Sequence, residues 1–391
     1  MAVTPERVGE LTLWLCAAAV VYGYLVYPIA IWILARCFGR RRLFLPPRDS
    51  DELPRVSLLI AAHNEEATIA ERLANALALD YPAEKLEIVI ASDGSSDRTA
   101  AIVRGCDDGR VRLIEYPNRR GKASVVNAAF RELTGDIVVL SDANTLTDPA
   151  AVRNLVRWFR SPEVGVVCGR LVLTDPDTGG NVDSMYWKYE TFLKKCESRL
   201  GALLGANGAI YAIRRTLFTG IRRDTLIDDF VIPLVTRLRT GCAIVYDADA
   251  VAREETPAAI GSEFVRRARI GTGGFQSVAV LWKLLNPAHG WIAFTFLSHK
   301  IVRWLCPFFL IGAFASNLLL LHRSSYIVTL AAQAALYVVA AVGTRSAGVG
   351  MASKLVRLTT LFAGMNLALL VGFYRWLTTE PEGVWSRTLR Q

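Results

Sequence analysis

The chain has 391 residues, a formal net charge of +9 and a hydrophobic content of 52%. It is too long for one small domain, and its hydrophobic content is too high for a purely soluble protein. Its seven cysteines form no C-x-x-C pair and lie near no histidine at ligand spacing, which fits a reducing compartment and predicts no metal–thiolate site.

The first predicted element is a transmembrane helix. Residues 11–35 carry no charge, and about 20 residues of helix cross the hydrocarbon core of a bilayer. Arginines follow at position 36 and at positions 40–42. This order predicts an external N-terminus and a cytoplasmic downstream side, and it disfavours a cleaved signal peptide, whose charges precede a shorter apolar run. We therefore expect a transmembrane helix with a basic juxtamembrane segment over residues 1–42.

Residues 43–260 are predicted to form a soluble α/β domain. Short apolar runs alternate with helical stretches in this part of the chain. The runs lie at 55–62, 87–93, 111–116 and 136–142, and the helical stretches lie near 66–78, 97–104 and 121–133. Strands that alternate with helices predict a mostly parallel sheet covered on both faces.

Acidic or amide residues follow three of these predicted strands: Glu65, Asp93, and the pair Asp142 and Asn144. Ligands bind beyond the carboxyl ends of the strands in such sheets. Each of these residues could instead belong to a turn or complement a helix N-terminus. Three acidic strand ends in one sheet favour a ligand site, and an Asp-x-Asn pair can hold a divalent cation through its oxygens.

The C-terminal third is predicted to return to the membrane. We expect interfacial amphipathic helices over 261–303, then spans at roughly 304–321, 326–343 and 355–374, within a region that ends at residue 391. Four spans would place the weakly basic tail outside, so either one span is re-entrant or the tail breaks the positive-inside rule. Much of the positive charge lies at 36–42 and 266–269, which indicates contact with anionic membrane lipids and not with nucleic acid.

Seven motifs, taken in order, carry a resemblance to a known family. They are "AAHNEE", "IASDGSSDRT", "NRRGKASVVNAA", "LSDANT", "GANGAIYAIRR", "IDDF" and "RRARI", and they extend over about residues 55–275. Together they resemble the membrane-embedded family 2 glycosyltransferases, which include the cellulose, chitin, hyaluronan and poly-N-acetylglucosamine synthases. The resemblance implies a GT-A fold, a nucleotide-diphosphate sugar donor and inversion at the anomeric carbon. Among such donors, a UDP-sugar is expected first.

The resemblance also implies a donor site. Its residues would be Glu65, Asp93, Lys122, Asp142 and Arg266. Asp142 and Asn144 match the family's metal-binding Asp-x-Asp and would hold Mg²⁺ or Mn²⁺, although the asparagine removes one negative charge. Lys122 would contact the diphosphate, and its alternative role is that of a solvated surface lysine.

The catalytic residues implied by the resemblance follow later in the chain. Asp229 matches the base that activates the acceptor hydroxyl, Asp228 precedes it, and Arg269 matches the arginine that faces the departing diphosphate. Arg266 and Ile270 replace the glutamine and tryptophan with which processive synthases hold the acceptor sugar. Gly205, Asn207 and Gly208 would form a wall on the acceptor side. The structural alternatives are a helix N-terminus at 228–229, a basic interfacial helix at 266–269 and a plain strand and turn at 205–213.

Two functions are therefore considered. The first is an inverting glycosyltransferase of the plasma (inner) membrane, multi-pass with a cytoplasmic catalytic domain, that moves a sugar to a lipid-linked or growing glycan in exopolysaccharide or cell-envelope synthesis. The second is a catalytically inactive assembly or binding subunit. The presence of Asp93, Asp142, Asp229 and Arg269 favours the enzyme.

Overall fold

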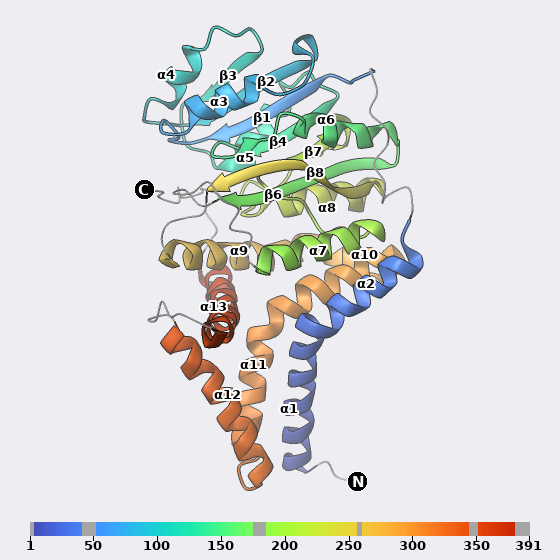
Figure 1. The fold of residues 1–391 in the computed structure, drawn as a ribbon, viewed down its shortest axis with the longest axis vertical. Helices are drawn as coiled ribbons and strands as arrows, with labels where there is room; N and C mark the ends of the chain where they lie inside the picture. The colour runs from blue at the N-terminus through green and yellow to red at the C-terminus, as the bar shows by residue number, and fades with distance from the viewer. Residues whose placement is uncertain (1–3, 41–51, 175–184, 256–259, 344–350, 380–391) are drawn as a thin grey trace. The chain divides into compact units, whose positions relative to one another are not determined.

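The computed structural model describes residues 4–40, 52–174, 185–255, 260–343 and 351–379 (Figure 1). These residues form two compact units. The membrane-helix unit contains the described residues of 4–30, 260–278 and 296–379, and the sheet unit contains those of 31–255 and 279–295. Each unit is described by itself.

The sheet unit is built on one sheet of eight strands in the order β3-β2-β1-β4-β7-β6-β8-β5. The strands are β1 (Val56–Ala62), β2 (Leu86–Asp93), β3 (Val111–Tyr116), β4 (Ile137–Asp142), β5 (Leu146–Thr147), β6 (Val164–Thr174), β7 (Tyr211–Arg214) and β8 (Ala243–Glu255). The expected α/β sheet is confirmed, and strands β3, β2, β1 and β4 all run parallel.

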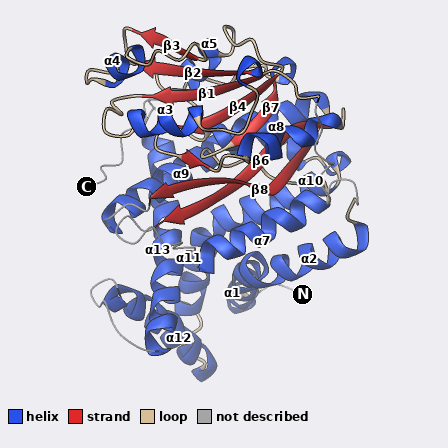
Figure 2. Ribbon diagram, turned by 45° about the horizontal axis from the view of Figure 1, so that its top comes forward, coloured by secondary structure: helices blue, strands red, loops and turns tan. Residues whose placement is uncertain are grey.

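The register of the parallel strands brings their carboxyl ends to one edge. Ala61 of β1 lies opposite both Ala91 of β2 and Asp142 of β4. Strands β1, β2 and β4 are buried along almost their whole length, which requires cover on both faces. Figure 2 shows helices in front of and behind these strands.

The three expected helices of this half are present but shorter than predicted. They are α3 (Ile69–Leu77), α4 (Thr99–Arg104) and α5 (Lys122–Ala129). Helix α5 cannot begin earlier, because Gly121 has a φ of +84° and this left-handed conformation interrupts a right-handed helix. Helix α3 begins at Ile69 because Glu65 and Thr68 form the preceding turn.

The second half of the sheet departs from the parallel arrangement. Strand β7 lies between β4 and β6 and is antiparallel to both, so the motif "GANGAIYAIRR" ends in a strand. Strands β6 and β8 pair in parallel with two register shifts. The helices of this half are α6 (Ala151–Val156), α7 (Met185–Arg199) and α8 (Asp228–Thr240).

The described chain contains four helices that are long and apolar enough to cross a membrane, namely Pro5–Phe38, Trp291–Leu318, Ser324–Gly343 and Leu355–Thr378. The second begins earlier than the expected span at 304. Its helical residues start directly after Gly290 and continue through residue 303. Elements within these helical regions are α1 (Pro5–Val21), α2 (Tyr27–Phe38), α10 (Trp291–Thr295), α11 (Val302–Leu318), α12 (Ser324–Gly343) and α13 (Met351–Thr378). Helix α9 (Ile260–Leu281) precedes the second span.

Candidate active site

Three carboxylates gather around one lysine at the carboxyl edge of the sheet. Lys122, the first residue of α5, places its Nζ 2.8 Å from Oδ1 of Asp142, which is the last residue of β4. The same Nζ lies 3.3 Å from Oδ2 of Asp228, the first residue of α8, at ion-pair distance but without hydrogen-bond geometry. We call Asp142, Asp228 and Asp229 the acid cluster.

Asp229 is held by the chain segment before β7. Its Oδ2 accepts a hydrogen bond from the backbone N–H of Gly208 at 2.9 Å, and its carbonyl accepts one from the N–H of Ala206 at 2.9 Å. A Cβ on Gly208 would lie 3.1 Å from Oδ2 of Asp142 and 3.6 Å from Oδ2 of Asp229. The absence of a side chain at Gly208 therefore lets the backbone pass close to both carboxylates.

Gly205 allows a second close approach in this segment. Its φ is +79°, and a Cβ there would lie 2.9 Å from the ring of Phe230 and 3.0 Å from the Cα of the same residue. Any other residue would be strained in conformation and would also clash. The structure thus brings together Gly205, Gly208 and Asp229, to which the family resemblance assigns the acceptor side and the base.

The electrostatics of the cluster follow from burial and like charge. Burial and the neighbouring charge of Asp228 raise the pKa of Asp229 above its ordinary value, while Lys122 opposes them. Burial acts to lower the pKa of Lys122, but Asp142 and Asp228 outweigh it and raise that pKa. An aspartate with a raised pKa binds a proton more readily than an exposed one, which is the property of a general base.

Asp93 has a different environment from the one expected. Its carboxylate is fully buried, and its two oxygens accept hydrogen bonds from the backbone N–H groups of Arg120 at 2.6 Å and Gly121 at 2.8 Å. Asp93 therefore fixes the loop that leads to Lys122. A contact with the nucleotide remains a prediction.

Glu65 and Asn144 lie at the same edge of the sheet. Thr68 Oγ1 donates to Oε2 of Glu65 at 3.0 Å, and the backbone N–H of Glu65 donates to Thr99 Oγ1 at 2.8 Å. These bonds match the structural alternative for Glu65, at the turn before α3. Asn144 is half-buried in the turn after β4. Donor and metal roles for the two residues stay predictions.

Arg266 and Arg269 belong to α9, in the membrane-helix unit. The acid cluster belongs to the sheet unit. The roles of these two arginines at the donor and the leaving group therefore remain predictions from the resemblance.

Two residues beside the acid cluster, Tyr211 and Lys194, were not predicted from the sequence. Tyr211 is 1% exposed, its hydroxyl has no hydrogen-bond partner among the described residues, and it lines a small internal cavity with Lys122 and Asp228. Lys194 of α7 donates a hydrogen bond to Oδ1 of Asn207, whose amide donates to the carbonyl of Gly169 at 2.8 Å. Lys194 resembles any charged residue of an amphipathic helix, so only the folded chain reveals its place.

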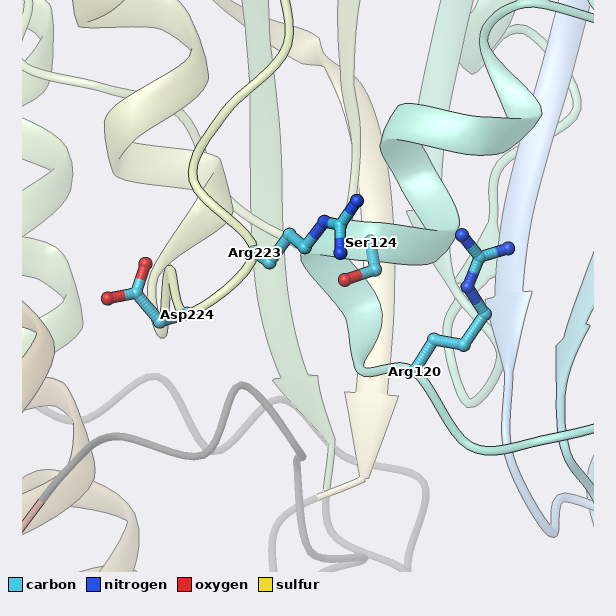
Figure 3. A pocket seen from close by; sticks show the side chains of 4 residues that line it. All are labelled: Arg120, Ser124, Arg223 and Asp224. Atoms are coloured by element: carbon cyan, nitrogen blue, oxygen red, sulfur yellow. The ribbon is translucent and has the colours of Figure 1, made fainter.

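An open pocket of about 350 Å³ is lined by Arg120, Ser124, Arg223 and Asp224 (Figure 3). Arg223 reaches toward Ser124 of α5, whereas Asp224 points the other way and forms an ion pair with Arg222 at 2.7 Å. Two arginines against one paired aspartate make this pocket suitable for an anionic group.

Residues 57–219 match the model of the family "Glycosyl transferase family 2". These residues form a family 2 glycosyltransferase domain. Curated proteins that are similar to the chain include the following two. The poly-beta-1,6-N-acetyl-D-glucosamine synthase of Staphylococcus aureus (strain COL) is 28% identical over 244 residues, 59% of this chain and 57% of the synthase. The probable glycosyltransferase YdaM of Bacillus subtilis (strain 168) is 38% identical over 125 residues, 30% of each chain.

A solved structure resembles the chain over most of its length. It is the mannosyltransferase PcManGT from Pyrobaculum calidifontis in complex with GDP-Man and Mn²⁺, with a TM-score of 0.71, 24% identity, and coverage of 94% of this chain and 99% of that one. At this identity the likeness shows the fold, and the expected GT-A fold is confirmed. The S. aureus match spans little more than half of the synthase, so its activity is not carried over from the match alone.

The predicted cation site has two protein ligands, Asp142 and Asn144. Among the described residues, no group of three or more His, Cys, Asp or Glu side chains could hold a metal ion. Oδ1 of Asp142 is bonded to Lys122, whereas Oδ2 lies beside Gly208, and Asn144 adds an amide oxygen. Because Mg²⁺ and Mn²⁺ accept substrate phosphates as ligands, one carboxylate and one amide fit a site that the substrate completes.

Asp229→Asn is expected to raise the melting temperature at pH 7.5. The pKa of Asp229 is higher in the folded chain than its ordinary value of 3.8, so the ionised form weakens folding above that folded pKa. The advantage of the amide should shrink as the pH falls through the folded pKa and vanish near 3.8. Melting curves of the detergent-solubilised protein between pH 4 and pH 8 would measure it.

Asp108→Asn is the matched control with the opposite sign. Hydrogen bonds from Arg110 lower the pKa of Asp108 to about 2. The charged form of Asp108 therefore favours folding at neutral pH, so its amide should lower the melting temperature at pH 7.5 and do so less at pH 4. A lower melting temperature for Asp229→Asn at pH 7.5 would contradict the role of burial and repulsion at Asp229.

Proposed function

We propose that this protein is an inverting glycosyltransferase that moves a sugar from a nucleotide-diphosphate sugar to a lipid-linked or growing glycan at the membrane. The preferred candidate for the donor is a UDP-sugar. One observation carries the proposal. The aspartate at the end of β4, Asp142, lies within the family-matched residues, and Asp229, half-buried near the start of α8 and shortly after those residues, approaches Gly208 together with it. Donor and acceptor would meet at this point.

The donor half of the reaction is assigned to α5 and the end of β4. The ammonium of Lys122 would pair with a diphosphate oxygen, which requires it to exchange part of its contact with Asp142. Asp142 and Asn144 would hold Mg²⁺ or Mn²⁺, and the ion would supply the positive charge that neutralises the diphosphate. The pocket with Arg120 and Arg223 supports the binding of an anionic donor on this side.

The acceptor half is assigned to α8 and the segment 205–208. Asp229 would take the proton of the acceptor hydroxyl as that oxygen attacks the anomeric carbon. The hydrogen bond from Gly208 fixes one carboxylate oxygen, and the other would accept the proton of the acceptor hydroxyl. A single base on the acceptor side gives one displacement, and one displacement inverts the anomeric centre. Arg269 would stabilise the departing diphosphate.

The Asp229→Asn variant tests this mechanism. We expect kcat to fall by about 10² to 10⁴, the usual contribution of general-base assistance, with donor binding nearly unchanged. Initial rates with a panel of nucleotide sugars and purified membranes would measure kcat, and isothermal titration with UDP would report donor binding.

Asp228→Asn is the control for this variant, because Asp228 pairs with Lys122 and not with Gly208. It should reduce transfer less than Asp229→Asn does. If Asp228→Asn abolishes transfer and Asp229→Asn does not, the base is Asp228. If neither variant changes the rate, the two aspartates only begin a helix and the mechanism is wrong.

Metal dependence is the next prediction. Chelation should abolish sugar transfer, and Asp142→Ala should do the same without lowering the melting temperature by more than a few degrees. Asn144→Asp should tighten the binding of Mn²⁺, because it adds a negative charge to the ligand set. Full activity of the wild-type protein in excess chelator would remove the metal from the mechanism.

We also propose a cellular location and a membrane topology for the protein. The protein would be a multi-pass protein of the plasma (inner) membrane, with an external N-terminus and the sheet unit in the cytoplasm. The supporting observations are the four membrane-length helices and the arginines at 36 and 40–42. The membrane lipids and the glycan acceptor would then be reached from the cytoplasmic side.

Cysteine labelling of intact cells tests this topology. Cys37 is the exposed cysteine among the described residues, so the background carries Cys37→Ser. An impermeant maleimide should react with Val3→Cys and should spare Asp108→Cys until the membrane is broken. The reverse pattern would contradict the proposed orientation.

A further inference from the structure

An arginine lies in the interior of the sheet unit. Arg72 of α3 is 1% exposed, although an arginine is almost never fully buried without partners and its transfer from water costs free energy. Burial lowers the pKa of Arg72 to about 10, and the charge of Asp142 opposes this change. The guanidinium is therefore still charged at neutral pH.

One hydrogen bond of Arg72 leads to the end of β4. Its Nη2 donates to Ser141 Oγ at 3.1 Å, and Ser141 is the residue before Asp142. The hydroxyl of Ser141 in turn donates to the carbonyl of Ala209 at 2.7 Å. Arg72 thus fixes the chain on both sides of the acid cluster: the strand end that carries Asp142 and the segment that carries Gly208.

A second hydrogen bond of Arg72 leads, through Asn75, to Thr147, which lies at the other end of segment 141–147. Its Nη1 donates to Oδ1 of Asn75 at 3.0 Å, one helical turn along α3. Oδ1 of Asn75 also accepts hydrogen bonds from the backbone N–H of Thr147 at 2.9 Å and from its hydroxyl at 3.1 Å. The amide of Asn75 donates to the carbonyl of Thr147 at 2.9 Å. Asn75 therefore clamps Thr147 from both sides.

A purely structural role explains this arrangement poorly. An apolar side chain would fill the interior at this point of α3 without the cost of burying a charge. The bonds of the Arg72–Asn75 pair converge on residues 141 and 147, which bracket Asp142 and Asn144. An arginine offers a planar fork that can bond two acceptors in fixed directions, which a lysine cannot reproduce.

We propose that Arg72 and Asn75 are positioning residues that hold the two ends of segment 141–147, and so set the directions of the metal-binding oxygens of Asp142 and Asn144. The inference rests on the proposed function only for what the segment binds. The inference that α3 holds segment 141–147 in place does not depend on the proposed function.

Two variants that conserve the net charge test the proposal. Arg72→Lys keeps the positive charge but loses the fork, and Asn75→Ala removes the clamp on Thr147. In hydrogen–deuterium exchange of the full chain in detergent, the amides of residues 142–147 should exchange about tenfold faster in each variant, since hydrogen bonds that close the segment are lost. Binding of Mn²⁺ in the presence of UDP, measured by electron paramagnetic resonance, should weaken about tenfold.

Arg214→Lys is the matched control. Arg214 bonds to the backbone carbonyls of Phe159, Ser161 and Val164 and is likewise a structural arginine of the same unit. It should lower the melting temperature without changing the exchange of 142–147 or the binding of Mn²⁺. Mn²⁺ binding should be weakened in Arg72→Lys and abolished in Arg72→Met.

Several outcomes would overturn the proposal. Unchanged exchange and unchanged Mn²⁺ binding in folded Arg72→Lys and Asn75→Ala would show that the pair only packs the interior. Equal effects in Arg214→Lys would show general destabilisation. If Arg72→Lys does not fold, Asn75→Ala decides the question alone. If the wild-type protein binds no Mn²⁺, the metal of the proposed function is wrong, and the exchange rates still decide whether α3 holds the segment.

Discussion

The candidate site depends on one shared ammonium group. Lys122 brings α5 into contact with the end of β4 through Asp142 and with the start of α8 through Asp228. Helix α5 and strand β4 are consecutive in the chain, whereas α8 lies far from both, and the carboxylates would repel one another without a cation between them. A partly buried ion pair of this kind contributes little to stability, because desolvation offsets the attraction. In the proposed reaction, its role is to fix where the donor and the acceptor meet.

Other groups at and near the site are also buried at a cost in folding free energy. Arg72 and Asp228 are buried, Asp229 has a raised pKa, and the hydroxyl of Tyr211 has no hydrogen-bond partner among the described residues. Each of these features costs folding free energy. Such costs are usual where a site must be organised before its ligand arrives. The surrounding sheet, with β1, β2 and β4 buried on both faces, supplies the stability that tolerates them.

The sequence predicted the parallel half of the fold because its signals are local. Apolar runs, turn residues and helical stretches between 55 and 142 each depend on neighbours a few residues away. Parallel pairing then placed Asp93 and Asp142 at one edge with no further information. The position of β7 between β4 and β6 was not predictable in this way. It depends on hydrogen bonds between residues about 70 positions apart, as between Leu140 and Tyr211.

For the site, the sequence alone determined which residues carry charge and which glycines allow a close approach. It singled out Lys122, Asp142, Gly208 and Asp229, and tertiary structure brought them together. Only the folded chain decided that the Asp93 carboxylate bonds to backbone N–H groups and that Arg72 faces inward. In the sequence, Arg72 looks like any charged residue of an amphipathic helix. Which face of a helix is buried depends on distant strands, and no local pattern records those contacts.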